Sequence, residues 1–298
     1  MTPNDRPRVL CVGLATLDVI QLVESLPGSN EKTVALDSLT AAGGPAANAA
    51  VAAAHLDGDV LLVTALAEHP VSDIIHADLA ACRVTVRAVP VDSPPVVASI
   101  LVTAGTGDRA IVSPTSSASG ATAPSVSAAE IAELLEGVTA VHLDGYYPSL
   151  AIPIAAAARA RGIPVLLDAG SFKPHTDAVL EHVEVAVVSG DFAPPGMTPD
   201  PVSVLAYLVE RGPTFAAVTR GARGIVFRGP QSRGAVPVER VNVIDTLGAG
   251  DFFHGALAVA VAQAGASDQE FSHQLAWASL VAGASVGSFG TRRWLGAR

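Results

Sequence analysis

VIDTLGAGDFFHG, residues 243–255, joins a strand-like run to a long apolar helical pattern through a Gly-Ala-Gly turn. The turn formed by Gly248, Ala249 and Gly250 allows consecutive backbone amides to point at one place, and the helix behind adds its partial positive charge. Such a turn is typical of anion sites, yet Asp251 follows at once. An acidic residue in a first helical turn is stabilised by about 0.3–1 kcal/mol. Asp251 is therefore either a simple helix cap or a reacting group beside a bound anion.

Outward from this stretch, short apolar strand patterns alternate with Ala-rich helical patterns. The expected strands are 8–13, 60–66, 140–144, 163–168, 183–189 and 214–219, and the expected helices are 46–56, 127–136, 149–162 and 200–212. This alternation predicts an α/β fold with a doubly wound, mostly parallel sheet and helices on both faces. We interpret residues 1–298 as a single domain of this kind.

Two segments interrupt the alternation, because residues 20–40 and 95–113 have strand-like character without a helical pattern. We expect them to form a small antiparallel sheet that acts as a lid over the edge of the main sheet. GTGDRA, residues 105–110, resembles a dinucleotide-binding fingerprint, but it joins two strand patterns and so predicts a hairpin turn. Residues 113–125 predict a surface loop, and residues 275–290 predict a buried helix rather than a membrane span.

The composition limits the kinds of partner. The chain has 18 basic and 28 acidic residues and a formal net charge of -10, which argues against binding nucleic acid. Because no Walker A pattern is present and the only lysines are Lys32 and Lys173, phosphate chemistry would rely on backbone amides, arginine or a metal ion. Two cysteines without CxxC spacing, and an N-terminal stretch without the apolar core of a secretory signal, predict a reduced, cytoplasmic protein with no membrane association.

A second glycine-containing element is AAGGPAAN, residues 41–48. Gly43 and Gly44 permit a ligand to approach the backbone, and the helix that begins there turns its free amide groups outward. Asn48 lies one turn into that helix and offers both a donor and an acceptor to a polyol. A plain glycine-rich turn before an Ala-rich helix explains the same residues, so the stretch alone favours neither interpretation.

Three further features fit a ligand site without requiring one. VTRGARG, residues 218–224, either passes a nucleotide or forms a tight turn between strands. His254 lies on the same helical side as Asp251, a pair that favours a substrate-facing or supporting role over a metal site. Carboxylates stand at the ends of strand patterns, where ligands bind in parallel sheets but where helix caps and turns also use such residues: Asp18, Asp144 and Asp168.

Taken together and in this order, the motifs resemble the PfkB or ribokinase family of carbohydrate kinases. The resemblance covers nearly the whole chain, through CVGLATLD, GGPAAN, GDRAIV, VTRGARG and DTLGAGD. It implies a doubly wound domain with a β lid that transfers the γ-phosphoryl group of ATP to a sugar hydroxyl with the help of Mg²⁺. Within the family, VIDTLGAGD and CVGLATLDVI are similar to ketohexokinase, whereas GGPAANAAVAAA is similar to sulfofructose kinase. Both likenesses imply a ketose, or a ketose derivative, as the substrate.

The resemblance also implies roles for individual residues. Asp251 corresponds to the catalytic base, which would accept the proton of the attacking hydroxyl while neighbouring amides offset the phosphoryl charge. The remaining correspondences are the anion hole at Gly248, Ala249 and Gly250, the substrate positions Asp18, Gly43, Gly44, Asn48, Arg109 and Asp144, and the nucleotide segment at Ser189, Thr219, Gly221 and Gly224.

The sequence departs from the family pattern at three places. Ser189 and Phe192 stand at the Asn and Glu positions of the family's NxxE element, so Mg²⁺ is expected to be held mainly by ATP and water. DTL replaces the commoner DTT, which leaves open whether Asp245 contributes to a potassium site. Pro45 stands where ketohexokinase has a sugar-binding Asn, which argues against plain fructose.

Two other functions remain open at this point. One is a nucleoside kinase of the same family. The other is a non-catalytic sugar or nucleotide sensor, an idea that the missing NxxE element motivates. Lid strands pair between subunits in some members of the family, so a homodimer formed through the lid is also an open expectation.

Overall fold

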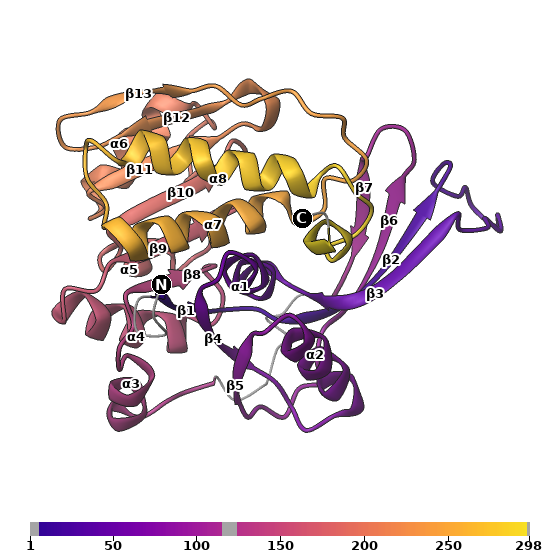
Figure 1. Ribbon diagram of the computed structural model, residues 1–298, viewed down its shortest axis with the longest axis horizontal. Coiled ribbons are helices and arrows are strands. Elements are labelled where there is room, and N and C mark those ends of the chain that lie inside the picture. The colour runs from indigo at the N-terminus through magenta and orange to yellow at the C-terminus, as the bar shows by residue number, and fades with distance from the viewer. Residues whose placement is uncertain (1–5, 115–123, 297–298) are drawn as a thin grey trace.

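The computed structural model describes residues 6–114 and 124–296, and it is built around a nine-stranded sheet (Figure 1). The spatial order is β13-β12-β11-β10-β9-β8-β1-β4-β5. Neighbouring strands are parallel from β5 to β11, whereas β12 and β13 are antiparallel. The strands are β1 (Arg8–Val12), β4 (Asp59–Ala65), β5 (Thr85–Val89), β8 (Ala140–Leu143), β9 (Val165–Ala169), β10 (Val185–Ser189), β11 (Phe215–Thr219), β12 (Ile225–Arg228) and β13 (Arg233–Val236).

Helices cover both faces of this sheet, which confirms the predicted α/β class. Alternate residues of β1 show the two sides, since Val9 and Cys11 belong to one core cluster and Leu10 and Val12 to the other. The first cluster is covered by α1 (Pro45–His55), α2 (Pro70–Ala81), α7 (Ala249–Ala264) and α8 (Phe271–Ser285). The second is covered by α3 (Ala128–Leu134), α4 (Pro148–Ala160), α5 (Thr176–Leu180) and α6 (Pro201–Glu210). Strands buried on both faces explain the continuous apolar runs of the sequence.

The expected lid is a separate four-stranded sheet that projects from one end of the main sheet (Figure 1). Its order is β3-β2-β6-β7, with β2 (Thr16–Val23), β3 (Asp37–Gly43), β6 (Val97–Thr103) and β7 (Arg109–Val112). The expectation of an antiparallel sheet is wrong for the central pair, because β2 and β6 run parallel. They do so because β2 follows β1 and β6 follows β5, and both leave parallel strands of the main sheet in the same direction.

Other expectations can be checked against the same structure. The segment 105–110 forms the predicted hairpin turn between β6 and β7, with positive φ angles at Gly105 and Gly107. The late helix α8 ends at Ser285, and it is not wholly buried, because the side chains of Trp277 and Leu280 are partly exposed. No helix among the described residues is long and apolar enough to cross a membrane. Residues 115–123 of the predicted surface loop lie outside the described residues.

The contact between α1 and α7 brings two distant parts of the sequence together. Gly255 of α7 faces α1 so closely that an added Cβ atom would lie 2.2 Å from the carbonyl oxygen of Ala49. The buried residues of α1 are alanines apart from Asn48 and Val51, so its backbone can approach a neighbour. This close crossing places Asn48, one turn into α1, beside Asp251 in the first turn of α7.

Candidate active site

The N-terminus of α7 has the form expected of an anion site. Gly248 precedes the helix with a φ angle of 74°, and it offers no side chain to bond the first-turn amides. The amides of the first turn have no acceptor inside an α-helix, and that of Ala249 makes only a long hydrogen bond, at 3.4 Å, to the carbonyl oxygen of Thr246 before the helix. A Cβ atom added at Gly250 would meet no described atom within 4 Å, so this part of the turn faces open space. The helix dipole favours negative charge at this point.

Asp251 lies beside this turn and is held by Asn48. The side-chain amide of Asn48 donates a hydrogen bond to Oδ2 of Asp251 at 2.8 Å. Burial, with a smaller contribution from the nearby carboxylates of Asp168, Asp144 and Asp18, raises the pKa of Asp251 to about 7, whereas the bond from Asn48 opposes the shift. A carboxyl group with a pKa near neutrality can both accept and release a proton under physiological conditions.

The sequence predicts free, outward-facing amides at the N-terminus of α1, but in the structure the amide of Ala46 is bonded by Asp144. Oδ2 of Asp144 accepts hydrogen bonds from the backbone amides of Ala46 at 3.1 Å and Leu14 at 2.8 Å, and Oδ1 accepts one from Tyr146 at 2.9 Å. Asp144 is almost completely buried, and burial raises its pKa to about 7 despite these three bonds. Gly13, which the sequence analysis did not single out, has to be a glycine, because a Cβ atom there would lie 2.0 Å from Oδ1 of Asp144.

Asp18 lies inside lid strand β2, which corrects its placement at the end of a strand of the main sheet. The hydroxyl of Thr16 donates to Oδ1 of Asp18 at 2.6 Å. Burial raises the pKa of Asp18, while the Thr16 bond and the charge of Arg292 oppose the shift. Gly43 leaves room for this carboxylate, since a Cβ atom there would lie 1.9 Å from Oδ2 of Asp18. The lid therefore contributes a buried carboxylate to the site.

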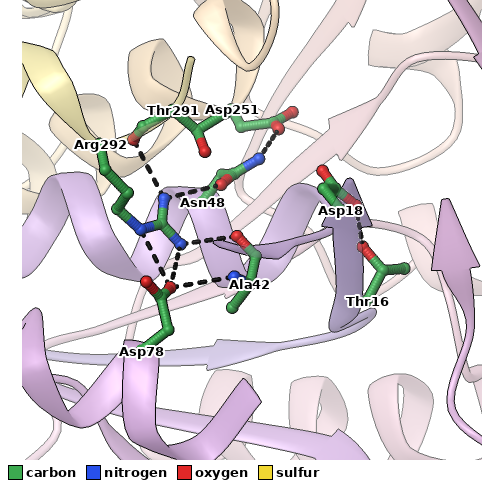
Figure 2. A network of polar contacts seen from close by, with 8 residues as sticks. All are labelled: Thr16, Asp18, Ala42, Asn48, Asp78, Asp251, Thr291 and Arg292. Carbon is green, nitrogen blue, oxygen red and sulfur yellow. Dashed lines mark hydrogen bonds and ion pairs between the residues drawn. The ribbon is translucent and has the colours of Figure 1, made fainter. Parts of the chain in front are cut away.

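Arg292 connects the site to the C-terminal segment, and the sequence analysis missed it. Figure 2 shows Asn48 between Asp251 and Arg292, whose Nη1 atom donates to Oδ1 of Asn48 at 3.4 Å. The guanidinium also donates to Oδ2 of Asp78, with Nη2 at 2.8 Å, and to the carbonyl oxygen of Ala42 at 2.6 Å. Because a guanidinium only donates, its bond fixes the amide oxygen of Asn48 toward Arg292 and the amide nitrogen toward Asp251. The arginine pair Arg292-Arg293 belongs to no motif that could have predicted this contact.

The tip of the lid contacts the segment that leads into the glycine turn. Nη1 of Arg109 donates to the hydroxyl of Thr246 at 2.8 Å, and that hydroxyl donates to the carbonyl oxygen of Gly107 at 2.9 Å. Asp245, the residue before Thr246, is buried and accepts hydrogen bonds from the amides of Leu247 and Gly290, both at 2.8 Å. Arg109 thereby contacts Thr246, which lies two residues before Gly248 of the turn, although Arg109 itself is exposed.

The predicted nucleotide residues gather at the ends of β10 and β11. Ser189 and Thr219 are register partners on these two strands. Gly221 and Gly224 both have positive φ angles and lie in the tight connection from β11 to β12, which contains the short 3-10 helix η2 (Gly221–Arg223). A Cβ atom at Gly224 would lie 2.7 Å from the carbonyl oxygen of Val236, so this glycine is required by the turn itself. The turn interpretation is therefore sufficient to explain Gly224.

The arrangement as a whole can hold an anion beside a base. Strands of a parallel sheet, a β lid and a glycine turn meet around one carboxylate, Asp251, whose pKa is near neutrality. The sequence has no Walker A lysine, so the turn amides are the groups of this arrangement with the form of a phosphate contact. This fold and site define the ribokinase-like class of kinases for small molecules that carry a hydroxyl group.

The chain belongs to the pfkB family of carbohydrate kinases, which its residues 6–295 match. A ribokinase of Bacillus subtilis (strain 168) is 24% identical over 295 residues, which cover 96% of this chain and 95% of that protein. The structure of Arabidopsis thaliana ribokinase complexed with ribose and ATP is 25% identical, has a TM-score of 0.77, and the match covers 96% of this chain and 94% of that one. Adenosine kinase from Sinorhizobium meliloti, at 18% identity and a TM-score of 0.75, shares the fold. The chain is thus a phosphotransferase of the sugar and nucleoside kinase family, and its relatives support the use of ATP.

Proposed function

We propose that this protein transfers the γ-phosphoryl group of ATP to a primary hydroxyl of a neutral sugar in a furanose-like form, with a ketose as the substrate. The observation that carries the proposal is the pairing of Asp251 with the open glycine turn at the start of α7. In this mechanism, ionised Asp251 accepts the proton of the attacking hydroxyl. The amides of Ala249 and Gly250 stabilise the charge on the transferring group, which is the largest part of catalysis in phosphoryl transfer.

The surroundings of Asp251 favour a neutral substrate. The charges of Asp18, Asp144 and Asp168 all act on Asp251, so the site is rich in carboxylates. Arg292 is already engaged by Asp78 and does not offer a free cation to the sugar. A second phosphate or a sulfonate on the substrate would be repelled here, which argues against the sulfonated ketose that one of the sequence likenesses suggests. Asp18, Gly43, Gly44, Asn48, Asp144 and, from the lid, Arg109 remain the proposed substrate residues.

The residues of this chain fit a potassium ion better than they fit a protein-bound Mg²⁺ ion. Phe192 is fully buried in the core, so it cannot replace the missing carboxylate of the NxxE element, and Mg²⁺ would be held mainly by the nucleotide and water. When bound, Mg²⁺ supplies neutralisation of charge on the phosphates. Asp245 fits a potassium site better, because it is a buried carboxylate whose two oxygens contact only backbone amides among the described residues. The nucleotide itself would lie along Ser189, Thr219, Gly221 and Gly224.

The proposal is tested by ADP release with a panel of neutral ketoses, ribose and other aldoses, nucleosides, and a phosphorylated ketose. We expect the highest kcat/KM with a ketose and little turnover of the phosphorylated sugar. Ribose is the second candidate, because ribokinases are among the relatives. Ligand binding without any ADP release above that of Asp251→Asn would contradict an enzyme and favour the sensor. Preferred turnover of a nucleoside would contradict the sugar.

A further inference from the structure

A second group of ligand-forming side chains lies beneath the candidate active site. His142 comes from β8, Asp168 from the end of β9, and His254 from α7. One ligand atom from each lies within 4.8 Å of those of the other two, and Nε2 of His254 is 3.3 Å from Oδ1 of Asp168. Three elements of the fold thus bring two imidazoles and one carboxylate to one place.

One of these side chains, His142, lacks the partners that buried polar groups normally have. His142 is fully buried, and neither of its ring nitrogens has a hydrogen-bond partner among the described residues. His254 is 4% exposed, and Nε2 of its imidazole lies 3.3 Å from Oδ1 of Asp168. An imidazole left without partners in a protein interior costs about 1–3 kcal/mol, so such a group calls for a bound ion or water.

We propose that His142, Asp168 and His254 form a binding site for a borderline divalent transition-metal ion, of which Zn²⁺ is the representative. Imidazole nitrogen with one carboxylate oxygen is a donor set that suits Zn²⁺, Co²⁺ and Ni²⁺, whereas Mg²⁺ prefers oxygen ligands alone. Both imidazoles are in the neutral form that binds metals, because burial lowers the pKa of His142 and of His254 to about 3.

The geometry needs a contraction to hold an ion. In a tetrahedral site, two ligand atoms bonded to one ion at about 2.1 Å lie about 3.4 Å apart, so a pair separated by up to 4.8 Å must close by up to about 1.4 Å. Rotation of the three side chains toward one another would supply this shift. The side chain of Asp168 is 13% exposed, which leaves an approach for the ion and a position for water as a further ligand. The ion would link α7 to β8 and β9 one helical turn beyond Asp251.

The test uses the whole protein, freed of metal with a chelator and then titrated with Zn²⁺ by calorimetry and with Co²⁺ by visible absorption. We expect one ion per chain, a raised melting temperature with Zn²⁺, and the intense visible band of four- or five-coordinate Co²⁺. His254→Asn and His142→Gln should each weaken binding by more than about tenfold. His273→Asn, which changes an exposed histidine of α8, is the matched control and should bind as the wild type does. Excess Mg²⁺ should not displace the ion.

Several results would overturn the proposal. Absence of stoichiometric binding to the wild type would do so without any variant, and this outcome would leave a buried water as the partner of the imidazoles. Binding that is unchanged in both His254→Asn and His142→Gln would assign the ion to another place. Ready displacement by Mg²⁺ would identify an oxygen site instead. None of these results bears on sugar phosphorylation, which is measured separately.

Discussion

Helices α1 and α7 begin in the same way, each after a glycine with a positive φ angle, Gly44 and Gly248, and neither has a side-chain cap from that residue. What meets their free amides differs. The amide of Ala46 at the start of α1 is bonded by Asp144, a carboxylate of the protein itself. At the start of α7, Gly250 faces open space. Two glycine motifs that look alike in the sequence therefore divide into a closed helix end, bonded by the protein itself, and an open one, where we propose that the phosphoryl group binds.

The largest expected contrast is between the two neighbouring carboxylates. Asp251→Asn should lower kcat by about 10²–10⁴-fold, because the general base is lost, without lowering stability at pH 8. Asp144→Asn should lower the free energy of unfolding by about 1–3 kcal/mol, because its new amide group faces backbone donors. Kinetics and urea unfolding of both variants check this pair. A destabilised Asp251→Asn with a stable Asp144→Asn would reverse the assignment.

The next comparison is between two variants that each add one methyl group, one at the N-terminus of α7 and one at that of α1. Gly250→Ala should fold normally but lower kcat by about 10²-fold, because the methyl group enters the space of the phosphoryl group. Gly44→Ala should lower stability by more than about 1 kcal/mol, because its φ angle is 92° and the new Cβ atom would lie 2.5 Å from the carbonyl oxygen of Leu14. Thermal unfolding beside kinetics separates the two outcomes. Full activity of Gly250→Ala would exclude the open end as the phosphoryl site.

The pH dependence of activity and of stability should also show the role of Asp251 at the open N-terminus of α7. Since the base must be ionised and the pKa of Asp251 is about 7, kcat/KM should fall about tenfold per pH unit below that value. The effect of Asp251 on stability should change with pH in the opposite direction to its effect on activity. A raised carboxyl pKa means that the folded state holds its proton more tightly, so the contribution of Asp251 to the stability of the ligand-free protein, measured against Asp251→Asn, should fall as pH rises from about 4 to about 7. A pH–rate profile and unfolding at several pH values check both statements, and a flat acid limb would contradict the first.

The smallest expected effect is on the link between the two helix ends. Asn48 donates to Asp251 and so opposes the rise of its pKa. Asn48→Ala should therefore move the acid limb of kcat/KM upward by a fraction of a pH unit, beyond any rise in KM from a lost sugar contact. Asn48→Asp, which adds a charge, should move it further in the same direction. An unmoved acid limb in both variants would assign the limb to a different group.

Much of the main sheet could be predicted from the sequence, because strands buried on both faces give continuous apolar runs. All six expected strands and all four expected helices of the main domain are present within a few residues. The strands β5, β12 and β13 and the helices α2 and α5 were not predicted. Two of these strands, β5 and β13, form the edges of the sheet, where half-exposed residues such as Arg87 and Arg233 interrupt the apolar pattern.

The candidate site could be predicted where its residues are neighbours in a short sequence motif. It could not be predicted where the contacts join residues far apart in the sequence. The glycine turn and Asp251 follow from a local pattern. Arg292 and Asp78 lie 214 residues apart, and no local pattern connects them. The same limit explains why the sequence paired His254 only with Asp251, since His142 and Asp168 reach it only through the order of β8 and β9 in the sheet.

The attachment of the lid has a mechanical consequence. Asp18 belongs to β2, and β3 ends at Gly43 directly before α1, so the lid strands continue into the floor of the site. A tilt of this sheet about its base changes the distance between Asp18 and Asp251 and carries Arg109 away from Thr246. The lid is thus mechanically coupled to the candidate site. A force that tilts its strands would act on Asp18 and on the contact between Arg109 and Thr246.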